Sequence, residues 1–177
     1  GEGLRFKLRS PETIKLYRDV LREMETDALE QMKGFYDQFE GELEGHALVP
    51  EDLKGGARGI GSYFRKLRDG RLADKDVLNA TLQNCLVDAK NWATKTSSRK
   101  DEIIRLAETS LIPLLQDAER FRPQKNRTIN SCRLSLQHLN KLQLLNHIDE
   151  EVRTLNREHN RFLLSDTNAL LHKLVHE

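Results

Sequence analysis

Apolar residues recur every three or four positions along two long stretches of this sequence, and that spacing limits the folds open to the chain. The first stretch opens with Ser10, Pro11 and Glu12, a typical helix start, and ends at Gly41 and Gly45. It predicts one helix of about 34 residues whose continuous apolar face needs partner helices. That face carries Ile14, Tyr17, Leu21, Met24, Ala28, Met32, Phe35, Phe39 and Leu43.

The second stretch follows Pro123 and has a spacing near 3.5 residues, as in coiled coils. Its apolar face carries Ile129, Cys132, Leu136, Leu139, Leu142, Leu145, Ile148, Val152 and Leu155. Shorter helices are expected at 62–68, closed by Gly70, at 74–93, at 103–115 with a kink at Pro113, and after a Ser165–Thr167 cap. Residues 45–61 and 94–100 are expected to be loops.

The pattern as a whole predicts an all-α fold, an elongated helical bundle with two long antiparallel helices and several shorter ones. No stretch alternates apolar and polar residues as a half-buried strand would. We expect residues 1–9 to be a linker or a cloning remnant and residues 10–177 to be a single helical domain, because 177 residues suit one domain with a real core.

The composition limits the cellular compartments and binding partners that suit this chain. No apolar run approaches the roughly 18 residues of a membrane span, and no signal peptide opens the sequence. The two cysteines, Cys85 and Cys132, fit neither a metal cluster nor a disulfide framework, which predicts reduced thiols. We therefore expect a cytoplasmic protein with no membrane partner. The formal net charge is only +1, so any basic surface must be local.

Residues 54–61 read KGGARGIG, a glycine-rich turn like those that bind dinucleotide phosphates. That interpretation requires a buried strand before the glycines, but the preceding residues 40–53 contain two glycines, a proline and five carboxylates. The Tyr-x-x-x-Lys pair of short-chain dehydrogenases is absent, and no Gly-Lys-Ser/Thr of a Walker A loop follows. We therefore expect no nucleotide at this turn.

Two interpretations of this turn remain. One is a flexible, solvated hinge between helices. The other is a phosphate-binding segment, because residues 54–71 contain one acid, Asp69, against a concentration of basic residues. Glycines allow close approach to phosphates, and Tyr63 or Phe64 is expected to pack on a sugar or base. The predicted DNA-binding residues are Lys54, Arg58, Arg65, Lys66, Arg68 and Arg71, and a second basic stretch lies at 120–127.

The sequence gives little support for a metal site, a catalytic site or a cofactor site. His172 and His176 have the spacing of two metal ligands on a helix, but no third ligand is evident, and histidines at a helix C-terminus are a commoner explanation. No nucleophile, acid–base pair or cofactor motif is recognisable. We expect no catalytic residue, no metal and no cofactor in this chain.

Two segments resemble a protein family. Residues 46–67, HALVPEDLKGGARGIGSYFRKL, and 156–167, NREHNRFLLSDT, are similar to a region of ATP-dependent exonuclease V beta-subunit-like proteins, UvrD/RecB-type superfamily 1 helicases with a nuclease domain. The likeness covers most of residues 11–176 and lies outside the catalytic motifs of the family. It corresponds to the helical subdomain called 1B, and Phe162–Thr167 resembles the segment that returns to the motor core, with Leu164 and Thr167 in place of an aromatic residue and a leucine.

The resemblance implies an excised accessory domain. The parent chain would be an ATP-dependent DNA helicase and exonuclease of DNA repair that needs ATP and Mg²⁺, whereas this fragment would carry no chemistry. The implied partners are the DNA backbone, the rest of the parent chain and a second helicase–nuclease subunit. As an insertion, it should bring residues 11 and 176 to the same end of the domain. The alternative is a helical scaffold that recruits proteins without binding nucleic acid.

Overall fold

The structure is a computed structural model that describes residues 10–176, and within that range it is helical with no strand. This confirms the all-α prediction. The contacts divide the chain into two compact units: Leu21–Arg133, and Gly1–Val20 together with Leu134–Glu177. The single-domain prediction stays a prediction, and residues 1–9, expected to be a linker, lie outside the described range.

The first long helix, α2, spans Pro11–Gly45, as the periodicity predicts. Ser10 caps it, since its hydroxyl oxygen accepts a hydrogen bond from the amide of Thr13 at 3.1 Å. Past its end, Arg99 donates to the carbonyls of His46 and Ala47, and the Ala47 bond is 2.7 Å long. This end of α2 is therefore tied to a segment more than fifty positions along the chain.

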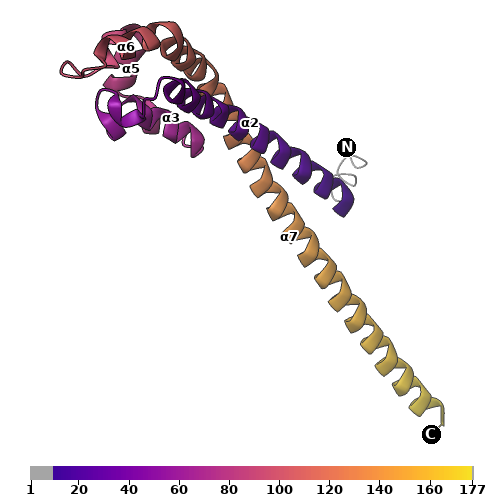
Figure 1. The fold of residues 1–177 in the computed structure, drawn as a ribbon. Helices are drawn as coiled ribbons and strands as arrows, with labels where there is room; N and C mark the ends of the chain where they lie inside the picture. Colours follow the sequence, from indigo (N-terminus) through magenta and orange to yellow (C-terminus); the bar gives the residue numbers. More distant parts are fainter. Residues whose placement is uncertain (1–9, 177) are drawn as a thin grey trace. The chain divides into compact units, whose positions relative to one another are not determined.

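Short helices follow α2 in the larger unit (Figure 1). They are η1 (Pro50–Asp52), η2 (Gly56–Arg58), α3 (Ile60–Arg68), α4 (Asp74–Val77), α5 (Ala80–Val87), η3 (Ala89–Asn91) and α6 (Lys100–Leu106). The single helix expected at 74–93 is wrong, because two polar side chains start new helices inside it. Asn79 accepts a hydrogen bond from the amide of Leu82, and Asp88 accepts one from the amide of Lys90, each at 2.9 Å.

The second long helix, α7, spans Ile112–His176 and follows a π-helical turn, η4, at Ala107–Leu111. That turn precedes Pro113, where the sequence predicts a kink. Two expected breaks are wrong: α7 runs through Pro123, and it continues past Ser165 without a cap. The Thr167 hydroxyl instead donates to the carbonyl of Leu163 at 2.8 Å, one turn back in the same helix.

Helices α2 and α7 run antiparallel within the larger unit. Phe35 stacks on Phe121 with ring centroids 6.3 Å apart, and Glu25 pairs with Arg133 at 2.6 Å. Residues later in α7 therefore contact residues earlier in α2. In the smaller unit, Arg18 donates to Asn140 at 3.1 Å, again between α2 and α7. The prediction of two long antiparallel helices is confirmed.

The core belongs to the larger unit and joins α2, α3, α5, α6 and the first part of α7. Phe39 of α2 stacks on Phe64 of α3 with centroids 4.2 Å apart, and Tyr63 meets Phe64 edge to face at 5.4 Å. Trp92 is fully buried, and its indole N–H donates to the carbonyl of Cys85 at 2.9 Å. This core holds the loop segments around residues 54–59 and 89–92 in place.

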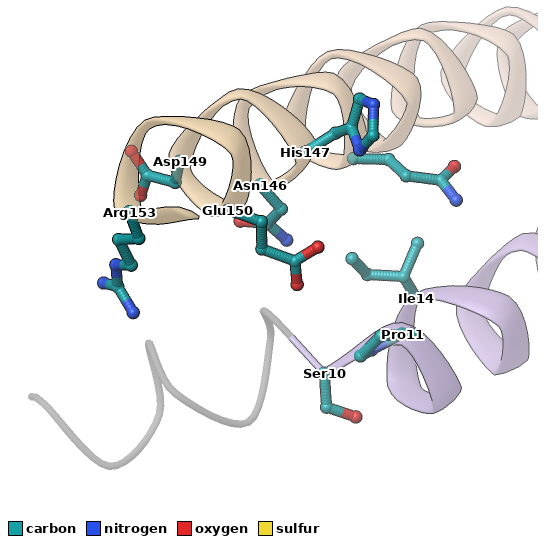
Figure 2. A pocket seen from close by; sticks show the side chains of 9 residues that line it. Ser10, Pro11, Ile14, Asn146, His147, Asp149, Glu150 and Arg153 are labelled. Atoms are coloured by element: carbon teal, nitrogen blue, oxygen red, sulfur yellow. The ribbon is translucent and has the colours of Figure 1, made fainter. Parts of the chain in front are cut away.

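In the smaller unit, α7 extends well beyond the start of α2. Figure 2 shows Ser10, Pro11 and Ile14 across a hollow from α7. The α7 side chains labelled there are Asn146, His147, Asp149, Glu150 and Arg153. From Arg153 the helix continues to His176, and 23 further residues at a rise of about 1.5 Å each give about 35 Å. Residues 11 and 176, expected near the same end of the domain, are therefore separated by this length of α7 within the smaller unit, which counts against a simple insertion topology.

Candidate nucleic-acid interface

The glycine-rich turn has an internal structural reason for its glycines. Gly55 has φ +82° and Gly56 has φ +52°, in the left-handed region that favours glycine. A Cβ at Gly59 would lie 2.1 Å from the carbonyl oxygen of Lys54. The Lys54 amide in turn donates to the carbonyl of Trp92 at 2.8 Å. The turn is thus a fixed structure packed against the segment 89–92, which speaks against a flexible hinge.

Three of the six predicted DNA-binding residues have carboxylate partners. Arg68 pairs with Asp69 at 2.8 Å, Arg71 pairs with Asp76 at 3.1 Å, and Arg65 approaches Glu51 at 3.8 Å. These pairs are largely solvent-exposed, and such pairs contribute little to stability. Each arginine can therefore exchange its partner for a phosphate, but it must give up a contact to do so.

The other three predicted residues differ from one another. The ammonium of Lys66 donates to the backbone carbonyl of Asp76 at 2.5 Å. Lys54 donates to the neutral amide oxygen of Asn91 at 3.2 Å, so its charge is not compensated there. Arg58 is exposed and makes no ion pair with any residue between 10 and 176.

The aromatic part of the sequence interpretation is wrong. Tyr63 is 2% exposed and Phe64 is fully buried, so neither can pack on a sugar or base. Burial, together with the neighbouring Glu119 carboxylate, raises the pKa of the Tyr63 hydroxyl above its ordinary value. The alternation of apolar residues with arginines in 60–68 reflects the buried face of α3, a pattern that sequence alone does not separate from a stacking site.

The second basic stretch, 120–127, has a structural role at its centre. Arg122 is 1% exposed, and its guanidinium contacts Glu119, Asp74 at 2.8 Å and the carbonyl of Leu72 at 2.6 Å. Burial alone would lower the pKa of Arg122, but hydrogen bonds to Glu119 and Asp74 raise it. This arginine joins α7 to the start of α4 and is not available to a ligand.

The uncompensated cations surround a small hollow, here called the glycine hollow. It has a volume of about 270 Å³ and is lined by Lys54, Gly55, Arg58, Gly59, Ala80, Thr81, Asn84, Cys85 and Asn91. Two cations and no carboxylate line it. Ala80 and Thr81 form the first turn of α5, whose positive dipole end adds to the field. The volume lies below that of drug-sized ligand pockets, and it suits a phosphate group better than a nucleoside.

A second, larger hollow adjoins the first and is here called the lysine hollow. It has a volume of about 670 Å³, and Lys54 and Asn91 line both hollows. Its lining contains four lysines and one carboxylate, Asp101: Lys54, Lys90, Asn91, Ala93, Thr94, Lys95, Lys100, Asp101 and Ile104. The sequence does not single out Lys90, Lys95 and Lys100, because they are spaced five residues apart and lie in η3, in the following loop and at the start of α6. These lysines come close to Lys54 only in the folded chain.

Other features of the described residues carry no comparable chemistry. The hollow in Figure 2, of about 630 Å³, mixes Asp149 and Glu150 with Arg153 and His147, so it has no excess of positive charge. No group of three or more metal-binding side chains exists among residues 10–176. Both cysteines are free and buried. None of the helices described in the structure combines the length and apolar character needed to cross a membrane.

Comparisons with protein-family models, with curated proteins and with solved structures find no match to this chain.

Proposed function

We propose that this chain is a non-catalytic, DNA-contacting accessory domain of an ATP-dependent DNA helicase and exonuclease of DNA repair. The family assignment rests on the sequence resemblance at residues 46–67 and 156–167. The DNA contact rests on the glycine hollow, which Lys54 and Arg58 line with no carboxylate beside them. Under this proposal ATP and Mg²⁺ act in the parent chain, and this domain contributes backbone contacts alone.

The single observation that supports the proposal best is the uncompensated charge of Lys54 and Arg58 at the glycine hollow. The glycine hollow has two cations and no carboxylate among its lining residues, which gives it a local excess of positive charge in a chain of net charge +1. A carboxylate-free pair at a rigid turn is suited to phosphate oxygens, which accept charge-assisted hydrogen bonds. Arg65, Lys66, Arg68 and Arg71 border this pair along the chain and supply further contacts when DNA displaces their present partners.

Fluorescence anisotropy with labelled duplex DNA, from about 50 to 200 mM salt, tests the proposal. Binding should be weak and independent of sequence, so two unrelated duplexes should give equal affinities. If about four phosphates are neutralised, the slope of log K against log salt should be roughly −3.6. An affinity that does not change with salt, or no binding at the lowest salt, would overturn the proposal.

A second candidate function is a protein-interaction scaffold, and the exposed apolar face of α7 favours it. Leu145, Ile148, Val152 and Leu155 are each between 46% and 63% exposed, although their spacing is that of a helix-packing seam. The occupant we propose is an amphipathic helix of another part of the parent assembly. Hydrogen exchange should then show amides at 144–175 protected in the parent protein and unprotected in the isolated chain. Equal exchange in both would exclude this candidate.

A further inference from the structure

We infer that the lysine hollow is a second phosphate-binding surface, so that a DNA backbone crosses from Arg58 over Lys54 to Lys90, Lys95 and Lys100. This inference rests on the proposed function and names a part of the site that the sequence does not reveal. The two hollows share Lys54 and Asn91, and they therefore form one continuous surface.

The lysine hollow carries an excess of positive charge. Lys90 and Lys95 are exposed and Lys100 is half-buried. None of the three forms an ion pair with a residue in the described range 10–176, and Asp101 is the one carboxylate among the lining residues. Arg99, beside Lys100, is held by Glu102 at 2.8 Å and is not part of this surface.

Backbone and side-chain hydrogen bonds fix the wall between the two hollows before any ligand binds. The Lys54 amide donates to the carbonyl of Trp92 at 2.8 Å, and the Asn91 side-chain amide donates to the carbonyl of Asn84 at 3.2 Å. Trp92 itself is fully buried, and its indole N–H donates to the carbonyl of Cys85 at 2.9 Å. A surface held in one geometry loses little conformational entropy on binding, which favours even weak backbone contacts.

The side chains that line the hollows indicate which kind of polyanion binds there. No aromatic side chain lines either hollow in the part of the chain that the structure describes, so bases have no stacking platform there. Protein partners are usually anchored by aromatic or other apolar side chains in pockets, and the lysine hollow offers mainly ammonium groups around Ala93 and Ile104. A regularly charged backbone, read through its phosphates, fits this surface better than an acidic peptide.

The test compares two triple variants of the full chain with the same change in net charge. Lys90→Gln, Lys95→Gln and Lys100→Gln together remove the charges of the lysine hollow. Lys33→Gln, Lys75→Gln and Lys141→Gln remove three charges outside both hollows. Far-UV circular dichroism verifies that each variant keeps its helices. Three contacts at the lysine hollow, added to the about four of the proposed function, would give a slope of log K against log salt of roughly −6 at about 0.9 units per phosphate contact. The first variant should flatten that slope by about 2 to 3 units, and the second by less than about 1.

The outcomes separate this inference from the proposed function. Equal changes in the two triple variants would overturn the lysine surface, because net charge alone would then explain the effect. An unchanged slope in the lysine-hollow variant would also overturn the lysine surface. If Lys54→Gln with Arg58→Gln still weakened binding in that case, the proposed function would stand. Absence of salt-dependent binding in the unmodified chain would overturn the proposed function itself. Displacement of DNA by poly-glutamate as effectively as by unlabelled duplex would replace the nucleic-acid backbone with an acidic polypeptide.

Discussion

At the scale of single residues, Arg122 shows how a basic sequence signal can be structural. Its guanidinium is buried among Glu119, Asp74 and the Leu72 carbonyl, so removal leaves those groups without a partner. We expect Arg122→Met to lower the free energy of unfolding by about 2 to 3 kcal/mol, toward the low end for broken buried pairs because Asp74 remains solvated. Urea denaturation followed by circular dichroism measures this.

Arg120 provides the matched control two positions away. Its side chain is 75% exposed and lies 3.8 Å from Asp117, so Arg120→Met should change the free energy of unfolding by less than about 0.5 kcal/mol. Similar losses in both variants would show that the Arg122 network does not stabilise the fold.

Cys85 offers a second test at the residue scale. It lines the glycine hollow but is 1% exposed, and burial raises the pKa of its thiol to about 11, against a smaller opposing effect of Lys54. Because the thiolate is the reactive form, a higher pKa slows alkylation. In a Cys132→Ser background at pH 8, iodoacetamide should modify Cys85 roughly 100-fold more slowly in the folded chain than in urea, with mass spectrometry as the readout. A folded-state rate equal to that in urea would mean that this thiol is not enclosed.

At the scale of elements, we expect Gly→Ala substitutions in the glycine-rich turn and in helix α2 to have opposite effects on stability. Gly59→Ala places a methyl group against the Lys54 carbonyl oxygen, where the space is already taken, and should cost about 1 to 3 kcal/mol of stability. Gly41→Ala lies inside α2, where a Cβ would meet nothing within 4 Å, and should stabilise by about 0.5 to 1 kcal/mol. Thermal unfolding of the two variants measures both effects. A gain of stability in Gly59→Ala would contradict the close packing of the turn.

The helices most accessible to sequence reasoning are those with a long repeat. The apolar period and the Ser10 cap predict α2 nearly to its ends, and the period predicts the antiparallel partner in α7. Local polar residues are ambiguous, because Asn79 and Asp88 cap new helices whereas Thr167 bonds within a continuous one. Short-range sequence does not distinguish these outcomes, since each depends on which carbonyl or amide the fold leaves open.

The apolar face of α7 shows a related limit. Ile129 and Cys132 are buried, Leu136, Leu139 and Leu142 are half-buried, and the residues from Leu145 onward are exposed. The periodicity is the same throughout, so it predicts a face suited to packing but not how much of that face is covered. The same limit applies to the candidate site. The sequence identifies Lys54 and Arg58, but only the fold brings the lysines of residues 90–100 close to them.

At the scale of the whole molecule, charge balance is the relevant quantity. With a net charge of +1, the chain has no global field that would draw it to nucleic acid, so any binding must come from local cations without partners. The proposed interface therefore depends on position: unpaired cations that line the two hollows contribute to DNA binding, whereas cations outside the hollows or paired with carboxylates contribute less.

The most direct test compares two double variants of equal charge change in the anisotropy titration against salt. Lys54→Gln with Arg58→Gln removes uncompensated cations, and it should flatten the slope of log K against log salt by about 1.8 units. Arg65→Gln with Arg68→Gln removes cations already paired with Glu51 and Asp69, and it should flatten the slope by less than about 1 unit. Circular dichroism verifies folding in both. An unchanged slope in the Lys54 and Arg58 variant would contradict the proposal that this surface contacts DNA.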